Sequence, residues 1–439
     1  MLKYILKRLG LSVVVLFGVS VIIYFLVRLM PTDYLESKFS AQIQQGTITH
    51  DQLDDFKKRY GLYMPESYLT IDMNGGAYAD VKFTKDVRTQ KYSDASEGLI
   101  SFGELYSGTY ESDAKNVVLE IDAGGTYKIL EKSGESSTVK ESGTFSATGS
   151  EISMIADGAQ FTSSVDCRKA SFGDKLMAVL GGYFSWLGNM LKGDLGDSFL
   201  YQMPVATVIA DHMWVSFLIS LVALIFQFAI AIPLGIISAT RQYSVVDYSV
   251  TVVTMIGISL PSFFFAALLI KIFSSWLGLF PASGLVSAGA SSTGIAYVLD
   301  MLHHLVLPML VLIVLSIGSL MRYTRTNMLE VLNSDYIRTA RSKGLSEKKV
   351  IYVHAFRNTM IPLMTLLAGI LPSLFGGAMI TEEVFAIDGI GRLAYKALQQ
   401  GDVPFIMGYN MFLAVLTVIG TLLSDLMYAV VDPRVKLSK

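Results

Sequence analysis

Few residues of this chain have the types and spacing that covalent chemistry needs. The 439 residues include no Gly-Lys pair, so the glycine-rich phosphate-binding loop that ends in Gly-Lys is absent. No His-Glu pair and no Gly-x-Ser-x-Gly run occurs, which excludes the zinc protease helix and the nucleophile turn of hydrolases. Ser-x-x-Lys runs lie at 137–140 and 346–349, but neither has a companion motif. We expect no catalytic residue, no metal site and no cofactor bound by this chain.

Histidine and cysteine do not alter this expectation. The adjacent His303 and His304 could ligate a metal ion, but such a pair more often marks a helix end at the level of the lipid headgroups. Cys167 is the only cysteine, so the chain cannot form an internal disulfide. We expect Cys167 to pack as a small apolar side chain.

Polar residues inside apolar runs are the remaining candidates, because a polar group in a membrane is costly and often marks a transport path. Gln227, Ser259 and Ser262 are the candidate pathway residues. The alternative is that they only hydrogen-bond neighbouring helices, and Lys271 could extend toward the outer surface. We expect Asp425 to order the inner half of the last apolar run.

The composition is that of a membrane protein, since 52% of the residues are hydrophobic and only 16% are charged. A helix needs about 20 mostly apolar residues to cross a bilayer. Runs of that size predict six transmembrane helices, at Leu9–Met30, Trp214–Ala239, Val246–Leu277, His304–Met321, Met360–Ile380 and Tyr409–Val431. Three prolines in these runs predict helix interruptions: Pro233, Pro261 and Pro372.

Lysine and arginine predict the orientation, because they are enriched in short cytoplasmic flanks. Lys3, Lys7 and Arg8 precede the first span, and the loop 322–358 contains eight such residues. The short loops on the other side contain only Arg392 and Lys396. We therefore expect both termini in the cytoplasm and the first span to remain uncleaved.

The segment 31–205 is then expected outside the cell. Each of its ends has apolar residues at helical spacing, which predicts short helices at the outer membrane surface. Residues 66–173 are instead rich in Gly, Ser and Thr with alternating apolar residues, which predicts a compact antiparallel β domain. The chain thus divides into 1–65 with the first span, this β insertion, and a membrane core of five spans at 174–439.

The long inner loop is the most informative segment. Residues 334–342 predict a short helix with Ile337 and Ala340 on one face, Gly344 ends it, and Ser346 begins a second helix. A rigid helix–glycine–helix unit can receive force from a soluble motor. The alternative is a plain solvated basic loop.

Several motifs, in order, give the chain a resemblance to a known family. LVRLMPTD follows the first span, FSWLGNMLKGDLGDSF precedes the second, and IAIPLGIISA and GISLPSFFFAALLI lie within the second and third. DYIRTARSKGLSEKKVIYVHAFRNTMIP, EEVFAIDGIGRL and LLSDLMYAVVDPRVK follow. In these motifs the chain resembles the permease subunits of bacterial ABC importers of the dipeptide, oligopeptide and nickel group. The resemblance implies an all-α polytopic membrane protein with six transmembrane helices, of the type I ABC importer permease fold. The small antiparallel β domain expected on the extracellular side is not part of the common family pattern.

The resemblance also implies a role for the inner loop. Residues of about 333–357 occupy the family's EAA-type loop, with Gly344 at its glycine and Arg338 where the general pattern has glutamate, as is usual in the peptide branch. This loop would sit in a cleft of a separate ATPase subunit. The implied ATPase-coupling residues are Asp335, Tyr336, Arg338, Thr339, Ala340, Lys343, Gly344, His354 and Asn358.

For function, the resemblance implies the permease subunit of an ATP-driven peptide importer, without enzyme activity of its own. The implied partners are a second homologous permease, two ABC ATPases that bind ATP and Mg²⁺, an extracellular lipid-anchored peptide-binding protein and membrane lipid, but no nucleic acid. The implied location is a bacterial plasma membrane, and the large insertion suits a Gram-positive cell. Nickel or another small solute is an alternative cargo. A membrane sensor with an extracellular ligand-binding domain and a secondary transporter are alternative functions.

Overall fold

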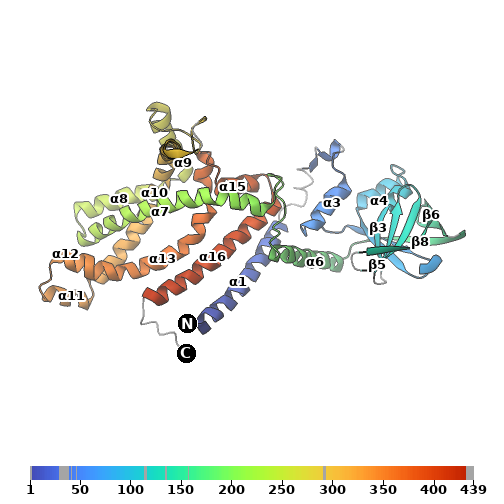
Figure 1. Ribbon diagram of the computed structural model, residues 1–439, viewed down its shortest axis with the longest axis horizontal. Coiled ribbons are helices and arrows are strands. Elements are labelled where there is room, and N and C mark those ends of the chain that lie inside the picture. Colours follow the sequence, from blue (N-terminus) through green and yellow to red (C-terminus); the bar gives the residue numbers. More distant parts are fainter. Residues whose placement is uncertain are drawn as a thin grey trace. The chain divides into compact units, whose positions relative to one another are not determined.

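The computed structural model describes residues 2–28, 39–40, 42–45, 47–112, 116–133, 136–156, 158–289 and 293–431 of the chain. They form two compact units, one of Met1–Ala41 with Asn189–Lys439 and the other of Gln42–Gly188. The first unit is helical, and the strands belong to the second (Figure 1). The predicted β insertion, 66–173, lies within the second unit.

The helices of the first unit follow the predicted apolar runs. Among the described residues, four helices are long and apolar enough to cross a membrane: α1 (Leu2–Arg28), α7 (Val205–Thr240), α10 (Gly294–Leu332) and α16 (Val403–Val431). A fifth span results if α8 (Val245–Ser259) and α9 (Ser262–Leu269) are counted with the π-helix Ile270–Trp276 that continues α9. The remaining predicted span, Met360–Ile380, corresponds to α13 (Phe356–Gly376), and several side chains of α13 lie outside the described part. The structure therefore has a helical, apolar core.

The proline predictions are right at one position and wrong at two. Pro261 lies at the break between α8 and α9, where the helix direction changes by 101°. Pro233 and Pro372, in contrast, lie within the continuous helices α7 and α13. A helix in a membrane core can continue through proline because neighbouring groups satisfy the freed carbonyl.

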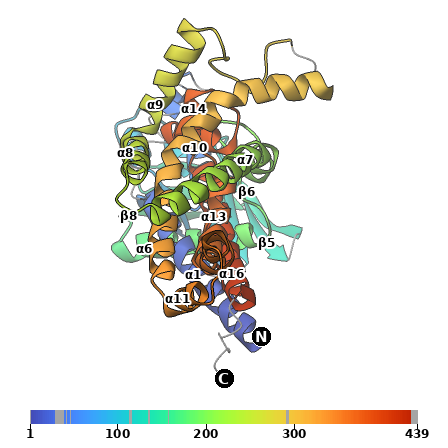
Figure 2. The same cartoon turned by 90° about the vertical axis from the view of Figure 1, so that its left-hand side faces the viewer.

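Glycines bring α10 close to two other helices, α7 and α8, and Figure 2 shows α7 passing across α10. A Cβ atom on Gly235 of α7 would lie 2.7 Å from the Thr324 Cβ of α10. A Cβ on Gly318 of α10 would lie 2.7 Å from the Thr254 carbonyl oxygen of α8. Small residues at such contacts let helix backbones approach closely. Helix α10 is therefore tightly packed against both α7 and α8.

The second unit is a closed antiparallel barrel whose strands follow one another in chain order. The strands are β1 (Ser67–Asp72), β2 (Lys82–Val87), β3 (Gly108–Ser112), β4 (Val117–Asp122), β5 (Thr126–Ser133), β6 (Ser136–Thr148), β7 (Glu151–Ala156) and β8 (Ala159–Lys169). Strand β1 closes the barrel because Ser67 pairs with Val87 of β2 on one side and with Lys169 of β8 on the other. The expected antiparallel β domain is present, and closure leaves it without an edge strand.

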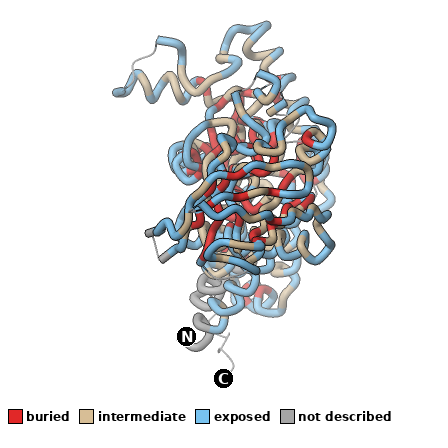
Figure 3. The backbone as a smooth tube through the Cα atoms, turned by 90° about the vertical axis from the view of Figure 1, so that its right-hand side faces the viewer, coloured by how far each residue is buried: buried red, intermediate tan, exposed pale blue. Residues whose placement is uncertain are grey.

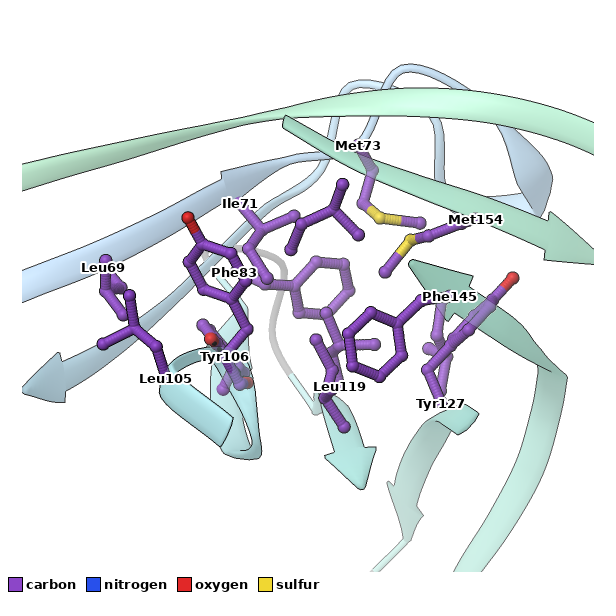
Figure 4. Packing of buried hydrophobic residues seen from close by; sticks show 14 of the residues in the cluster. Leu69, Ile71, Met73, Phe83, Leu105, Tyr106, Leu119, Tyr127, Phe145 and Met154 are labelled. Atoms are coloured by element: carbon purple, nitrogen blue, oxygen red, sulfur yellow. Dashed lines mark hydrogen bonds between the residues drawn. The ribbon is translucent and has the colours of Figure 1, made fainter. Parts of the chain in front are cut away.

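Large apolar side chains fill the barrel. Leu69, Ile71, Phe83, Leu119 and Met154 are completely buried and belong to one cluster (Figure 4), and buried positions recur along the chain in Figure 3. Cys167 of β8 packs against this core, as its expected apolar role requires. The interior is thus a packed core of the kind found in small closed barrels.

Inserted segments are fastened to the barrel by polar contacts. Lys85 of β2 donates to the Leu105 carbonyl, at 2.9 Å, and to the Ser107 carbonyl, which ties down α5 (Phe102–Tyr106) after α4 (Thr89–Ser96). Burial lowers the pKa of Lys85 to about 7. The Glu141 carboxylate accepts from the Ala77 amide, at 2.8 Å, and so holds the connection between β1 and β2.

The two predicted flanking helices are also present, as α3 (His50–Arg59) and α6 (Phe172–Leu191). Asp54 of α3 forms a bidentate ion pair with Arg88, with a shortest distance of 2.5 Å. A Cβ on Gly61 would lie 2.5 Å from the Gly182 carbonyl of α6. These contacts make α3 and α6 part of the barrel unit, and their place at a membrane surface stays a prediction.

Candidate functional site

The inner loop has the predicted helix–glycine–helix form. Helix α11 (Asp335–Ser342) ends before Gly344, which has a φ of +73°, and α12 (Glu347–Lys349) follows. The π-helix Val350–Ala355 then leads into α13. Only glycine adopts this φ without steric cost, and here it allows the chain to reverse between the two helices.

The loop rests on the core through one apolar face. Ile337 is completely inaccessible and Ala340 nearly so, as the predicted helix face requires. These two residues belong to a cluster that joins the loop to the ends of α7 and α10. This loop cluster consists of Ile236, Ala239, Met328, Ile337, Ala340, Val350 and Ala355. Burial of the isoleucine, methionine and valine side chains of this cluster contributes about 1.5–3 kcal/mol each. The loop is therefore packed onto two helices of the core, in contrast to a plain solvated loop.

The opposite face of the loop is exposed and charged. Asp335, Tyr336, Arg338, Thr339 and Lys343 are all solvent-exposed. Arg338 lies 3.7 Å from Asp335, a distance at which an exposed pair contributes little. This face presents the coupling residues implied by the family resemblance, whereas Ala340 belongs to the buried face.

Two contacts stiffen the ends of the loop. Arg341 of α11 donates to the Glu347 carboxylate of α12 at 2.8 Å, so an ion pair bridges Gly344. Asn358 donates to the His354 carbonyl at 2.8 Å within the helical turn that enters α13. His354 and Asn358 thus lie beyond the helix–glycine–helix unit, at its connection to the core.

A cavity of about 580 Å³ lies between α7, α10 and α13. Gln227 lines it and donates to the Leu312 carbonyl of α10 at 3.1 Å, so both predicted roles of this side chain are compatible with its position. Polar residues that also line the cavity are Ser220, Ser316, Ser319, Tyr323 and Ser373. We refer to this cavity as the central groove.

The structure does not bring the three predicted pathway residues together. Ser259 is exposed on α8, where its hydroxyl donates to the Met255 carbonyl, and neither it nor Ser262 lines the central groove. The residues that the sequence reasoning missed on α10, Ser316, Ser319 and Tyr323, have a spacing of three and four. That spacing was the available signal, because residues three and four apart share a helix face.

A buried glutamate organises the residues beside one end of the central groove. Glu382 of α14 (Met379–Val384) accepts from the Ser216 hydroxyl at 2.8 Å, the Ala378 amide at 2.9 Å and the Arg392 amide at 3.0 Å. Burial raises the pKa of Glu382 above the ordinary glutamate value, and the three donors oppose this shift. The carboxylate thereby joins α7, α14 and α15 (Ile390–Gln399), a role that the sequence analysis did not identify.

The other singled-out residues have separate positions. Lys271 lies 5.8 Å from the ring centre of Trp276, on the π-helix, and the side chain of Asp425 is outside the described part. His303 contacts the Leu279 carbonyl at 2.8 Å, and His304 is buried. In the described part of the chain, no three His, Cys, Asp or Glu side chains gather closely enough to hold a metal ion.

Comparison with known proteins adds to this geometry. Residues 231–437, which include the inner loop, match the family model described as "Binding-protein-dependent transport system inner membrane component". Over 255 residues the chain is 41% identical to the oligopeptide transport system permease protein AppB of Bacillus subtilis. This match covers 58% of this chain and 79% of AppB.

Two further matches have lower identity. Over 274 residues the chain is 34% identical to the dipeptide transport system permease protein DppB of Escherichia coli, covering 58% of this chain and 81% of DppB. A solved inward-facing structure of the MetNI methionine ABC transporter shares 16% identity at a TM-score of 0.39, and covers 51% of this chain and 96% of that one.

Proposed function

Because this chain belongs to the family of binding-protein-dependent transport system inner membrane components, we propose that it is a permease subunit of an ATP-driven importer of peptides. The observation that carries the proposal is the 41% identity to an oligopeptide permease across 79% of that protein's length. The match to the family model includes the inner loop. The helical, apolar core makes the chain a multi-pass protein of the plasma membrane. The relatives' names favour oligopeptide or dipeptide cargo over nickel.

In this proposal the inner loop is where separate ATPase subunits bind. The exposed face of α11 supplies the contact, and the buried face carries any movement to α7 and α10 through Ile337 and Ala340. ATP and Mg²⁺ are bound by the ATPases, since the chain has no phosphate-binding loop of its own. Two ATPases and a second, homologous permease complete the membrane complex.

The central groove is proposed as this chain's half of the translocation pathway. Its mixture of serine, glutamine and tyrosine with apolar residues suits peptides, whose backbone groups need hydrogen-bonding partners and whose side chains vary. Gln227 is the proposed substrate-facing residue of the three identified in the sequence. Ser259 and Ser262 would instead face lipid or contact the second permease.

We further propose that both termini are cytoplasmic, that the barrel unit is extracellular, and that the cell is Gram-positive. A lipid-anchored binding protein would deliver peptides to the outer mouth, where the barrel serves as a docking surface or gate. The filled interior of the barrel favours a protein partner over a small ligand, and so disfavours the sensor alternative.

The proposal is tested by affinity purification of the chain from its native membrane in mild detergent, followed by mass spectrometry and peptide uptake in reconstituted vesicles. A second permease, two ATPases and a peptide-binding protein should co-purify, and uptake should need ATP. Recovery with a signalling protein, or uptake driven by a proton gradient alone, would refute it.

The groove is tested by cysteine labelling from the aqueous phase in a Cys167→Ser background. Ser319→Cys should react with a hydrophilic maleimide and be protected by peptide in the assembled complex. Val253→Cys on α8 is the matched control, because it is equally a membrane-helix position but outside the groove. Equal protection of both positions would contradict the assignment.

The role of the barrel is tested by deletion. Residues 66–173 are replaced by a short Gly/Ser linker, and Asp54→Asn is added because the partner of Asp54, Arg88, leaves with the barrel. Uptake and affinity for the binding protein should both fall. If neither changes, the docking and gating roles are both wrong.

A further inference from the structure

An ion pair between a buried carboxylate and a partly buried arginine joins the α7–α8 turn to α10. Asp247, on the first turn of α8, accepts two hydrogen bonds from Arg325 of α10, at 3.0 and 2.9 Å. The Ser238 hydroxyl and the Tyr243 amide, at 3.0 Å, donate to the same carboxylate. Four donors thus converge on a side chain that is only 5% exposed. A fork-shaped guanidinium bound in this way fixes orientation as well as distance.

The ion pair lies next to the loop cluster, which holds the inner loop against the core. Asp247 accepts from Ser238, and Ile236 and Ala239, two residues before and one residue after Ser238, belong to the loop cluster. Arg325 is one turn from Met328, which belongs to the same cluster. Asp247 is therefore linked to the helix end that carries Ile236 and Ala239, and Arg325 lies one turn from another member of the cluster.

The close glycine contacts extend this connection along the helices. Gly235 holds α7 against Thr324, the residue next to Arg325. Gly318 holds α10 against α8 at Thr254, two turns beyond Asp247. Between these points, α7, α8 and α10 have little freedom to slide.

We propose that Asp247 and Arg325 are positioning residues which make α7, α8 and α10 a single rigid body, so that movement of the inner loop reaches the bent span α8–α9. This inference rests on the proposed function and adds the route by which ATP-driven movement leaves the loop. Without the ion pair, the inner loop could move without moving α8.

The test uses the whole complex and the paired substitution Asp247→Asn with Arg325→Gln. Removing both charges leaves no unpaired charge in the core, so the chain should still fold and assemble. Peptide-stimulated ATP hydrolysis and uptake should be lost, while the basal ATPase rate and ATPase co-purification stay. Arg322→Gln, one turn away on the exposed side of α10, is the matched control and should behave as the parent.

A distance measurement separates rigid coupling from simple stability. Spin labels replace Val252 of α8 and Tyr352 of the loop, both exposed, in a Cys167→Ser background. In the parent the distance should be the same with and without nucleotide, and in the paired variant it should shift or broaden. An unchanged distance together with normal uptake would overturn the inference.

If the paired substitution prevents assembly of the complex, a conservative variant provides the test. Arg325→Lys keeps the charge but loses the fork, so it should assemble and show reduced coupling with a broadened distance. Normal coupling in Arg325→Lys would overturn the inference. Absence of ATPases from the parent preparation would instead overturn the proposed function itself.

Discussion

Replacement of Gly344 is the sharpest test of the inner loop. The residue has a φ of +73°, and a Cβ added to it would meet no atom within 4 Å. Within this chain the cost of a substitution is therefore entirely conformational. It amounts to about 1–2 kcal/mol for an ordinary L-residue and is larger for a β-branched one.

This cost predicts a graded series. About 1–2 kcal/mol corresponds to a factor of about 5–30 in the population of the native loop. Gly344→Asn should be near the parent, because asparagine tolerates this region, Gly344→Ala should be intermediate, and Gly344→Val should lose most activity. ATPase co-purification and peptide uptake are measured for each variant.

The control is Gly278→Val, at a position with a φ of +61° and equally open surroundings, but at the end of the π-helix after α9. It has the same backbone cost and should leave ATPase binding intact. Normal assembly and uptake in Gly344→Val would refute the reasoning. If Gly344→Asn were as defective as Gly344→Val, the cause would be a close contact with the ATPase instead of the backbone.

Three further predictions follow from buried groups. Ile337→Ala should cost about 2–5 kcal/mol in the loop cluster and reduce ATPase recovery in co-purification. Glu382→Ala leaves three donors without their acceptor, at about 1–3 kcal/mol each, so the melting temperature of the complex should fall; Glu383→Ala, at a less buried neighbour, should change it less. Residues 42–188 should fold alone. Burial lowers the pKa of Lys85 to about 7 in the folded unit, so above that pH the unfolded chain binds more protons than the folded one. The free energy of unfolding should therefore rise from about pH 7 to about pH 10, the ordinary lysine pKa. Denaturant titrations measure this, and Lys85→Met should remove the rise.

Features that depend on local pattern could be predicted from the sequence. The length of the apolar runs located the long helices, and apolar periodicity located the two faces of α11 and the strands of the insertion. Gly344 was recognisable because a glycine after a helical pattern marks its end. These features rest on a few neighbouring residues, so one chain is enough to identify them.

Features that depend on which helices meet could not be predicted. Ser259 and Ser316 are both serines in apolar runs, yet only Ser316 faces the central groove, since packing through Gly235 and Gly318 decides which faces meet. Asp247 and Arg325 are 78 residues apart, and nothing near either one indicates the other. Pro233 shows the same limit, because neighbouring helices override its local tendency to break α7.

The antiparallel pairing of β1 with β8 has an evolutionary consequence. Ser67 and Lys169 are cross-strand partners, so the chain enters and leaves the barrel at adjacent positions, about 5 Å apart. Insertion or removal of the whole domain in a single genetic event would therefore leave the segments on either side close together. The match to AppB covers 79% of AppB but only 58% of this chain. A longer chain with unmatched residues is what acquisition of a domain would produce.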